Sequence, residues 1–174
     1  MPDVWRRLAR LRVPLGFVAG TLVLWLARPV WSSIVLGTVA AVIGEGIRVW
    51  AAGHLEKSRE VTRSGPYRWF RHPLYVGSAL MGIGVAVAAN SLVAAAGIFV
   101  YLAVTMTAAV RTEEAFLRAK FGPEYDEYCR GESRAPDRRF SVARAWRNRE
   151  YRAVLGMGAV FAILALKVFL ATGP

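Results

Sequence analysis

The chain has 174 residues, of which 55% are hydrophobic, and its mean hydropathy of +0.35 excludes an ordinary soluble domain of this size. The net charge of +11 would suit nucleic acid, but the basic residues cluster between apolar segments, which is typical of membrane proteins and indicates no nucleic-acid partner. The single cysteine, Cys129, excludes an intrachain disulfide.

Apolar segments predict an all-α, polytopic integral membrane helical bundle with about five transmembrane helices. After a basic interfacial stretch at residues 1–12, they run from Val13 to Ala27, from about Val30 to Ala52, twice between Pro73 and Val110, and from Ala153 to Thr172. Short polar breaks at residues 28–29 and 90–91 predict tight turns, so we expect two antiparallel hairpins. Gly77, Gly82 and Gly84 would let the third and fourth helices approach closely.

We expect one membrane domain with three parts: a basic segment and hairpin at residues 1–52, a core at 53–131, and a basic connector with the fifth helix at 132–174. Arginine and lysine number four before the first segment, five in 53–72, none at 90–91 and eleven in 111–152. By the positive-inside rule the N-terminus and both polar loops are cytosolic and the C-terminus is outside. The composition, rich in Ala, Val, Gly and Arg, favours a bacterial inner membrane.

Three ionisable residues fall inside the predicted helices. Glu45 and Arg48 are three residues apart and share one helix face. They either neutralise each other or place one of them at a ligand site. Lys167 is close enough to the end of its helix to extend its amine to the membrane surface.

The stretch from Gly65 to Gly77 combines aromatic and basic residues where a charged loop meets an apolar helix. Pro73 suits the first turn of that helix, which puts Arg71 and His72 at its N-terminus, where cations are disfavoured without a nearby anion. The end of the fourth segment, Glu113-Glu114, would supply that anion, because the two helices form a hairpin. A pocket at the membrane surface is therefore predicted.

The sequence indicates no phosphate-binding, dinucleotide-binding, metal or nucleophilic site of a common kind. No glycine-rich phosphate loop or dinucleotide fingerprint occurs. His54 and His72 are eighteen residues apart and lack carboxylates at ligand spacing, so no metal site is predicted. No nucleophile with an adjacent base stands out.

The motifs resemble a known family. Residues 61–77, which include Arg71-His72-Pro73-Leu74-Tyr75, are followed by Glu113-Glu114 and by Phe121-Gly122-Pro123-Glu124-Tyr125-Asp126-Glu127-Tyr128. In this order and spacing they resemble the isoprenylcysteine carboxyl methyltransferase family and, more broadly, integral membrane methyltransferases that include phospholipid N-methyltransferases. The similar region covers about residues 48–130.

The resemblance implies S-adenosylmethionine as cofactor, bound on the cytosolic side by the core, and an amphiphilic methyl acceptor in the bilayer, either isoprenylcysteine-carboxylate-like or a lipid. The residues implied in cofactor binding are Val61, Thr62, Tyr67, Arg71, His72, Pro73, Leu74, Tyr75, Glu113 and Glu114. Arg71 and Glu114 have an equally good interpretation as an ion pair with each other.

The resemblance leaves the catalytic residues open. Eukaryotic members carry an arginine, associated with the substrate carboxylate, four residues before the first glutamate of the pair, where this chain has Ala109. Arg111 and Glu114 are the candidates for a catalytic role here. Two other functions remain: a nicotinamide-dependent membrane reductase of the sterol-reductase type, and a membrane protein without enzymatic activity.

Overall fold

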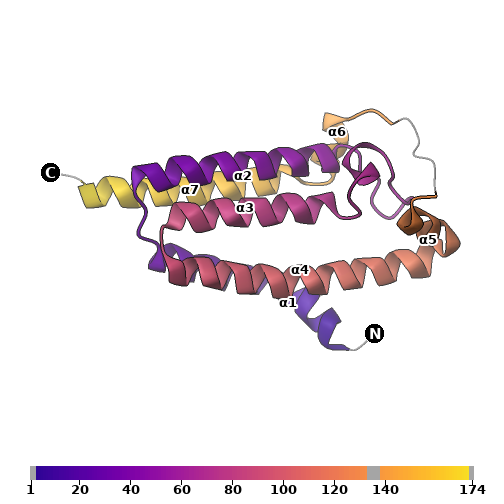
Figure 1. Cartoon of the computed structure of the whole chain (residues 1–174), viewed down its shortest axis with the longest axis horizontal. Coiled ribbons are helices and arrows are strands. Elements are labelled where there is room, and N and C mark those ends of the chain that lie inside the picture. Colours follow the sequence, from indigo (N-terminus) through magenta and orange to yellow (C-terminus); the bar gives the residue numbers. More distant parts are fainter. Residues whose placement is uncertain (1–2, 133–137, 173–174) are drawn as a thin grey trace.

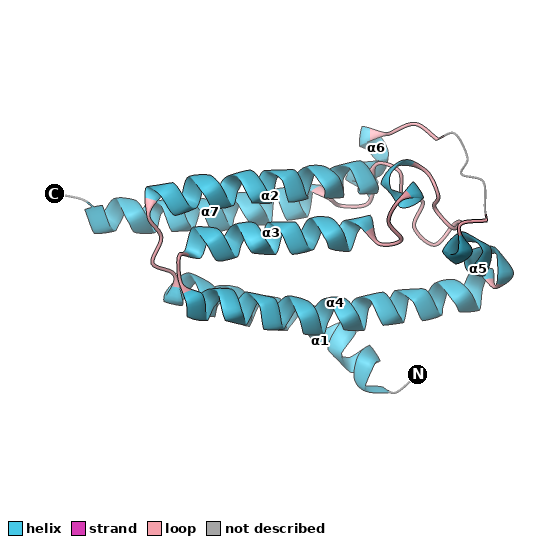
Figure 2. Ribbon diagram, viewed as in Figure 1, coloured by secondary structure: helices cyan, strands magenta, loops and turns pink. Residues whose placement is uncertain are grey.

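The computed structural model describes residues 3–132 and 138–172, and all regular structure in these ranges is helical (Figures 1 and 2), as expected. The helices are α1 Asp3–Leu26, α2 Trp31–Ala52, a 3-10 turn Gly65–Arg68, α3 Pro73–Ala89, α4 Leu92–Phe121, α5 Pro123–Arg130, α6 Val142–Arg147 and α7 Tyr151–Thr172. The breaks predicted at residues 28–29 and 90–91 are confirmed. The helix predicted for the first segment begins earlier, within the basic stretch.

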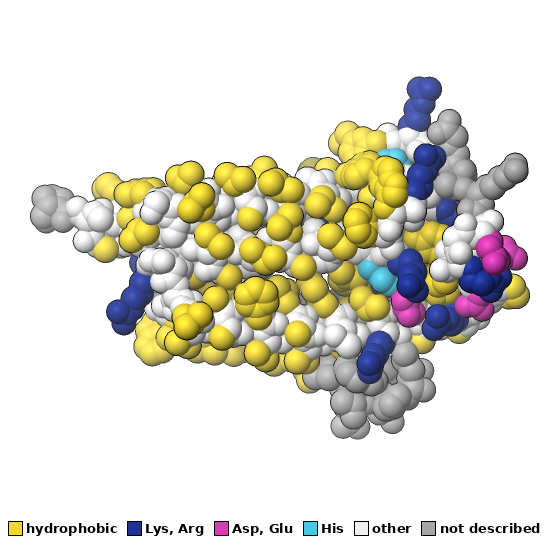
Figure 3. Space-filling view, viewed as in Figure 1, with side chains coloured by type: hydrophobic (Ala, Val, Ile, Leu, Met, Phe, Trp, Pro, Cys, Tyr) yellow, Lys and Arg dark blue, Asp and Glu magenta, His cyan; other side chains and the backbone are white. Residues whose placement is uncertain are grey.

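The molecule is an elongated bundle whose outer faces are apolar. Three helices are long and apolar enough to cross a membrane, namely α2, α4 and α7, and Pro14–Leu26 and Pro73–Ala89 are shorter apolar helices. Large side chains such as Phe17 and Leu92 are 76% and 87% exposed, as expected for surfaces that face lipid. Charged side chains gather at the end that holds α5 and α6 (Figure 3). Five crossings and their orientation stay predictions.

The first two helices do not form the expected hairpin. Instead α1 packs along α4, α2 packs along α3, and α7 contacts both α2 and α3 (Figure 1). The two turns meet at the apolar end, where Arg28 donates its backbone N–H to the carbonyl of Ala89 at 2.8 Å and Asn90 donates its side-chain amide to the carbonyl of Arg28. The chain therefore crosses to the far side of the bundle between α1 and α2.

Glycines bring the backbones of α2 and α3 into contact. A Cβ on Gly44 would lie 2.6 Å from the carbonyl oxygen of Gly77, and a Cβ on Gly84 would lie 2.5 Å from that of Gly37. The expectation that Gly77 and Gly84 would face the fourth helix is thus wrong, and of the three glycines only Gly82 faces α4, at Leu102. Small residues allow the close approach on which helix packing in lipid depends.

The amine of Lys167, which was predicted to extend to the membrane surface, binds the end of α1. Its ammonium donates to the backbone carbonyls of Leu24, Trp25 and Ala27, at 2.8, 3.1 and 2.6 Å. These carbonyls lie at the C-terminal end of α1, where a cation is favoured by the helix dipole and satisfies groups that have no partner within the helix. Lys167 therefore joins α7 to α1.

We expect Gly44→Ala to destabilise the protein, because the new methyl group would displace the α3 backbone. Overpacking of this kind costs about 1–3 kcal/mol. Gly46→Ala, two residues away in the same helix, is the matched control, because nothing lies within 4 Å of its Cβ position. It should be neutral or more stable by up to about 1 kcal/mol. Thermal unfolding in detergent measures both, and equal effects of the two variants would contradict the close contact.

Candidate functional site

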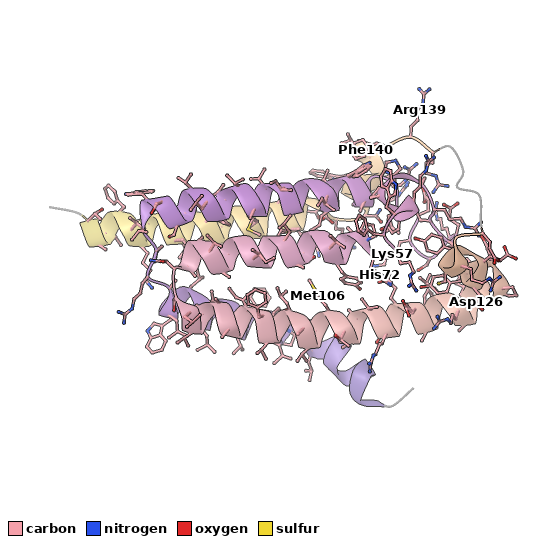
Figure 4. The ribbon with its side chains drawn as sticks, in the orientation of Figure 1. Lys57, His72, Met106, Asp126, Arg139 and Phe140 are labelled. Carbon is pink, nitrogen blue, oxygen red and sulfur yellow. The ribbon has the colours of Figure 1, made fainter. Side chains whose placement is uncertain are left out.

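A cavity of about 1110 Å³ lies between α3 and α4 at the charged end of the bundle. It exists because α3 packs closely against α2 and less closely against α4. Residues 55–62 and the segment before α7 complete its wall. In Figure 4, His72 and Met106 lie toward the space between α3 and α4.

The structure brings most of the predicted cofactor-binding residues together around this cavity. Eight line it: Val61, Thr62, Tyr67, Arg71, His72, Leu74, Tyr75 and Glu113. Pro73 is buried at the first position of α3, and Glu114 contacts His72 without lining the cavity. Arg111 is exposed on α4 and does not line it.

The anion expected near Arg71 and His72 is Glu114. Its Oε1 atom lies 3.2 Å from Nε2 of His72 and 3.9 Å from a guanidinium nitrogen of Arg71. Arg118, one turn further along α4, approaches its other oxygen at 3.9 Å. Because Arg71 and Arg118 are half exposed, these two ion pairs are weak, and the shorter contact with His72 determines where the Glu114 carboxylate lies.

Glu113 has a different environment from its neighbour. It is half-buried, lines the cavity, and forms no hydrogen bond or ion pair with any residue that the structure describes. Burial raises the pKa of the nearby Tyr67 hydroxyl, and the negative charge of Glu113 raises it further. A carboxylate without a partner in a cavity favours a cationic or hydrogen-bond-donating ligand.

Aromatic rings form much of the cavity wall. Tyr125 and Tyr128 lie on one side of α5, as expected, with ring centroids 6.1 Å apart. The Tyr128 hydroxyl donates to the backbone carbonyl of Tyr67 at 2.8 Å, which joins α5 to the 3-10 turn. The sequence motif around Tyr125 therefore forms part of the cavity wall beyond the end of α4.

The basic connector, for which no role was predicted, holds the loop after α2 against the cavity. Arg144 donates to the carboxylate of Glu56 at 2.8 Å, and this hydrogen bond lowers the pKa of Glu56. Arg138 pairs with Glu60, and Asn148 donates to the carbonyl of Leu55 at 2.9 Å. Partners about 80–90 residues apart leave no local signal by which the sequence could have identified them.

Glu45 and Arg48 of α2 do not form the ion pair with each other that the first interpretation predicted. Arg48 pairs with Glu150, immediately before α7, at 2.6 Å, and both residues line the cavity. Glu45 does not neutralise Arg48 in a direct ion pair, and its carboxylate oxygens are buried without a hydrogen-bond partner among the described residues. Arg48 lines the cavity, and the second interpretation, in which one member of the pair lies at a ligand site, stays a prediction.

The comparisons with known proteins point to one family. The family described as phospholipid methyltransferase matches residues 30–124, just over half of the chain. No solved structure matches. Within the described residues no group of three or more His, Cys, Asp or Glu side chains could hold a metal ion.

Curated relatives are 32–34% identical over 57–61% of this chain. The nickel-cobalt-cadmium resistance protein NccN of Alcaligenes xylosoxydans xylosoxydans is 32% identical over 61% of this chain and 49% of its own length. The cobalt-zinc-cadmium resistance protein CzcN of Cupriavidus metallidurans is 34% identical over 61% and 48%. A probable protein-S-isoprenylcysteine O-methyltransferase of Oryza sativa is 32% identical over 57% and 58%. The chain thus spans about half the length of the curated relatives it matches.

We expect Tyr128→Phe to change how stability depends on alkaline pH. Burial raises the pKa of Tyr128 to about 12, whereas a tyrosine in the unfolded chain ionises near pH 10. The stability that this group contributes is therefore complete below about pH 10 and is lost as the pH rises from 10 to 12. The variant lacks the hydrogen bond to Tyr67, which lowers its free energy of unfolding by about 1 kcal/mol. Because phenylalanine cannot ionise, the variant also lacks the loss of stability between pH 10 and 12. Thermal unfolding should show a stability difference at pH 8 that shrinks by pH 11, and a constant difference would contradict the assignment.

Proposed function

Since the chain belongs to the phospholipid methyltransferase family, we propose that it is an integral membrane methyltransferase that uses S-adenosylmethionine and methylates an amphiphilic acceptor. Glu113 is the observation that carries the proposal. Its half-buried, unpartnered carboxylate faces a cavity with aromatic walls at the ends of membrane helices. Neither the family match nor the relatives favour the nicotinamide-dependent reductase.

The residues present fit the proposed cofactor. Glu113 suits its cationic groups, and Tyr67, Tyr75 and Tyr128 offer ring faces to a cation or to a base. Arg71, at the rim, suits a carboxylate. A cavity of about 1110 Å³ exceeds the usual range for a single small ligand and has room for a cofactor together with part of an acceptor.

When bound, S-adenosylmethionine supplies a methyl group on a sulfonium, which passes to a nucleophilic atom of the acceptor while the sulfur keeps the bonding electron pair and becomes a thioether. The chain's own contribution is positioning and exclusion of water. Glu114 orients His72 through the 3.2 Å contact, and the Arg144–Glu56 and Arg138–Glu60 pairs hold the covering loop in place. Arg111 lies outside the cavity, so we assign it no catalytic role.

The acceptor is proposed to reach the cavity from the bilayer. Leu102 and Met106 of α4 give the cavity an apolar side at the level of the membrane helices. The positive charges of the polar loops support a cytosolic opening in a bacterial inner membrane. One relative is named for an isoprenylcysteine substrate, and the matching family is named for phospholipids, so an apolar chain with a polar headgroup is common to both names.

We expect Glu113→Gln to weaken binding of S-adenosylmethionine by tenfold or more, because an amide cannot balance the positive charge of the ligand. Calorimetry on the protein in detergent would measure the dissociation constants of S-adenosylmethionine, S-adenosylhomocysteine and NADPH. The exposed Glu127, which does not line the cavity, provides the matched control Glu127→Gln, with unchanged affinity.

His72→Ala should also weaken binding. Binding of NADPH but of neither adenosyl compound would refute the methyltransferase proposal. Unchanged affinity in both Glu113→Gln and His72→Ala would move the cofactor site away from this cavity.

A further inference from the structure

Arg48 of α2 and Glu150, which precedes α7, form a charged pair that has no part in the cofactor site described above. Nε of Arg48 lies 2.6 Å from Oε1 of Glu150, and both residues line the cavity. The side chains are only 20% and 7% exposed. A pair so buried is costly to desolvate and is weak evidence for a stabilising role, so a functional role has to be considered.

The pair is held in a fixed orientation. Nη1 of Arg48 donates to the hydroxyl of Ser78 and to the carbonyl of Leu74, one turn apart on α3. Glu150 lies at the start of α7, where the positive end of the helix dipole favours a carboxylate. Three helices therefore fix the positions of the two charged groups, which is the arrangement a recognition site needs.

Each member of the pair keeps one free atom. Nη2 of Arg48 and Oε2 of Glu150 have no hydrogen-bond partner among the described residues, and neither is fully enclosed by protein. One hydrogen-bond donor and one acceptor, side by side, are thus available to a ligand in the cavity. A ligand with complementary groups would satisfy both without adding net charge to the buried pair.

Arg48 lies one turn before the end of α2, so the pair lines the cavity beside the membrane helices as well as beside the loop that follows α2. Ser78 of α3 accepts a hydrogen bond from Arg48, and Leu102 and Thr105 of the apolar helix α4 line the same cavity. Lys57 and Glu60, by contrast, belong to the polar loop at the outer rim. An amphiphile whose chain lies in the bilayer would reach the pair along this apolar wall.

We propose that Arg48 and Glu150 bind the headgroup of the methyl acceptor and thereby determine acceptor specificity. The headgroup has an oxyanion, which accepts from Arg48, next to a protonated amine, which donates to Glu150. This inference rests on the proposed function. The same chemistry occurs in the amino-acid end of the cofactor, and the experiment below distinguishes these two sources.

Three probes with the same ten-carbon chain test the headgroup chemistry: 2-aminodecanoic acid carries both groups, decanoate only the anion and decylamine only the cation. Calorimetry on the full chain in decyl maltoside, with titrations into empty micelles subtracted, gives each dissociation constant. We expect 2-aminodecanoic acid to bind at least tenfold more tightly than either other probe. Equal affinities for the three probes would overturn the proposal without any variant.

The double variant Arg48→Gln/Glu150→Gln removes both charges and keeps two amides that can hydrogen-bond, which avoids leaving one buried charge unpaired. We expect its preference among the three probes to fall below threefold, with its dissociation constant for S-adenosylhomocysteine changed less than twofold. Arg139→Gln is the control, because Arg139 is exposed and points away from the bundle (Figure 4), and it should keep the preference.

The outcomes separate the two proposals. An unchanged preference in the double variant would show that the pair does not bind the headgroup. Tenfold weaker binding of S-adenosylhomocysteine in the double variant would assign the pair to the cofactor and overturn the inference. If the unaltered protein fails to bind S-adenosylhomocysteine, the proposed function fails, while the probe preference still decides whether this pair recognises a zwitterion.

Discussion

The backbone contact between α2 and α3 is the constraint on which the other features depend. Glycines at Gly44 and Gly77, and again at Gly37 and Gly84, leave no room for a side chain between these helices. Lipid gives helices little hydrophobic reason to associate, so close backbone packing decides which pair forms. With α3 held against α2, the start of α3 reaches α4 through the contact of His72 with Glu114, and a cavity lies between the two helices.

The same constraint separates the chemistry of the cavity into two sides. Where α4 passes the start of α3, consecutive glutamates point to different partners: Glu114 holds His72, and Glu113 stays available to a ligand. On the other side, the α2–α3 pair presents Arg48, and α7 adds Glu150 to it. Under the proposed function, the cofactor would bind on the side of Glu113 and the acceptor on the side of Arg48, as transfer between two bound reactants requires.

The connector and α7 give the second half of the chain a role in the site. Arg144 and Arg138 bind the acidic residues of the loop after α2, and Lys167 joins α7 to the end of α1. The last helix is therefore tied to the bundle at both ends, and the position of Glu150 depends on it. This explains physically why a segment outside the recognised motifs contributes to the cavity.

The helical segments, the turns at residues 28–29 and 90–91, and the contact between His72 and the Glu113-Glu114 pair could be predicted from the sequence. Turn residues and apolar segments act locally, and a two-residue turn makes two helices neighbours. That Gly77 faces α2, and that Arg48 pairs with Glu150, 102 residues away, depends on how the helices pack and could not be predicted. A glycine allows close approach of any neighbouring helix, and a charged side chain pairs with any opposite charge that packing brings near. The local sequence therefore determines neither the helix that Gly77 contacts nor the partner of Arg48.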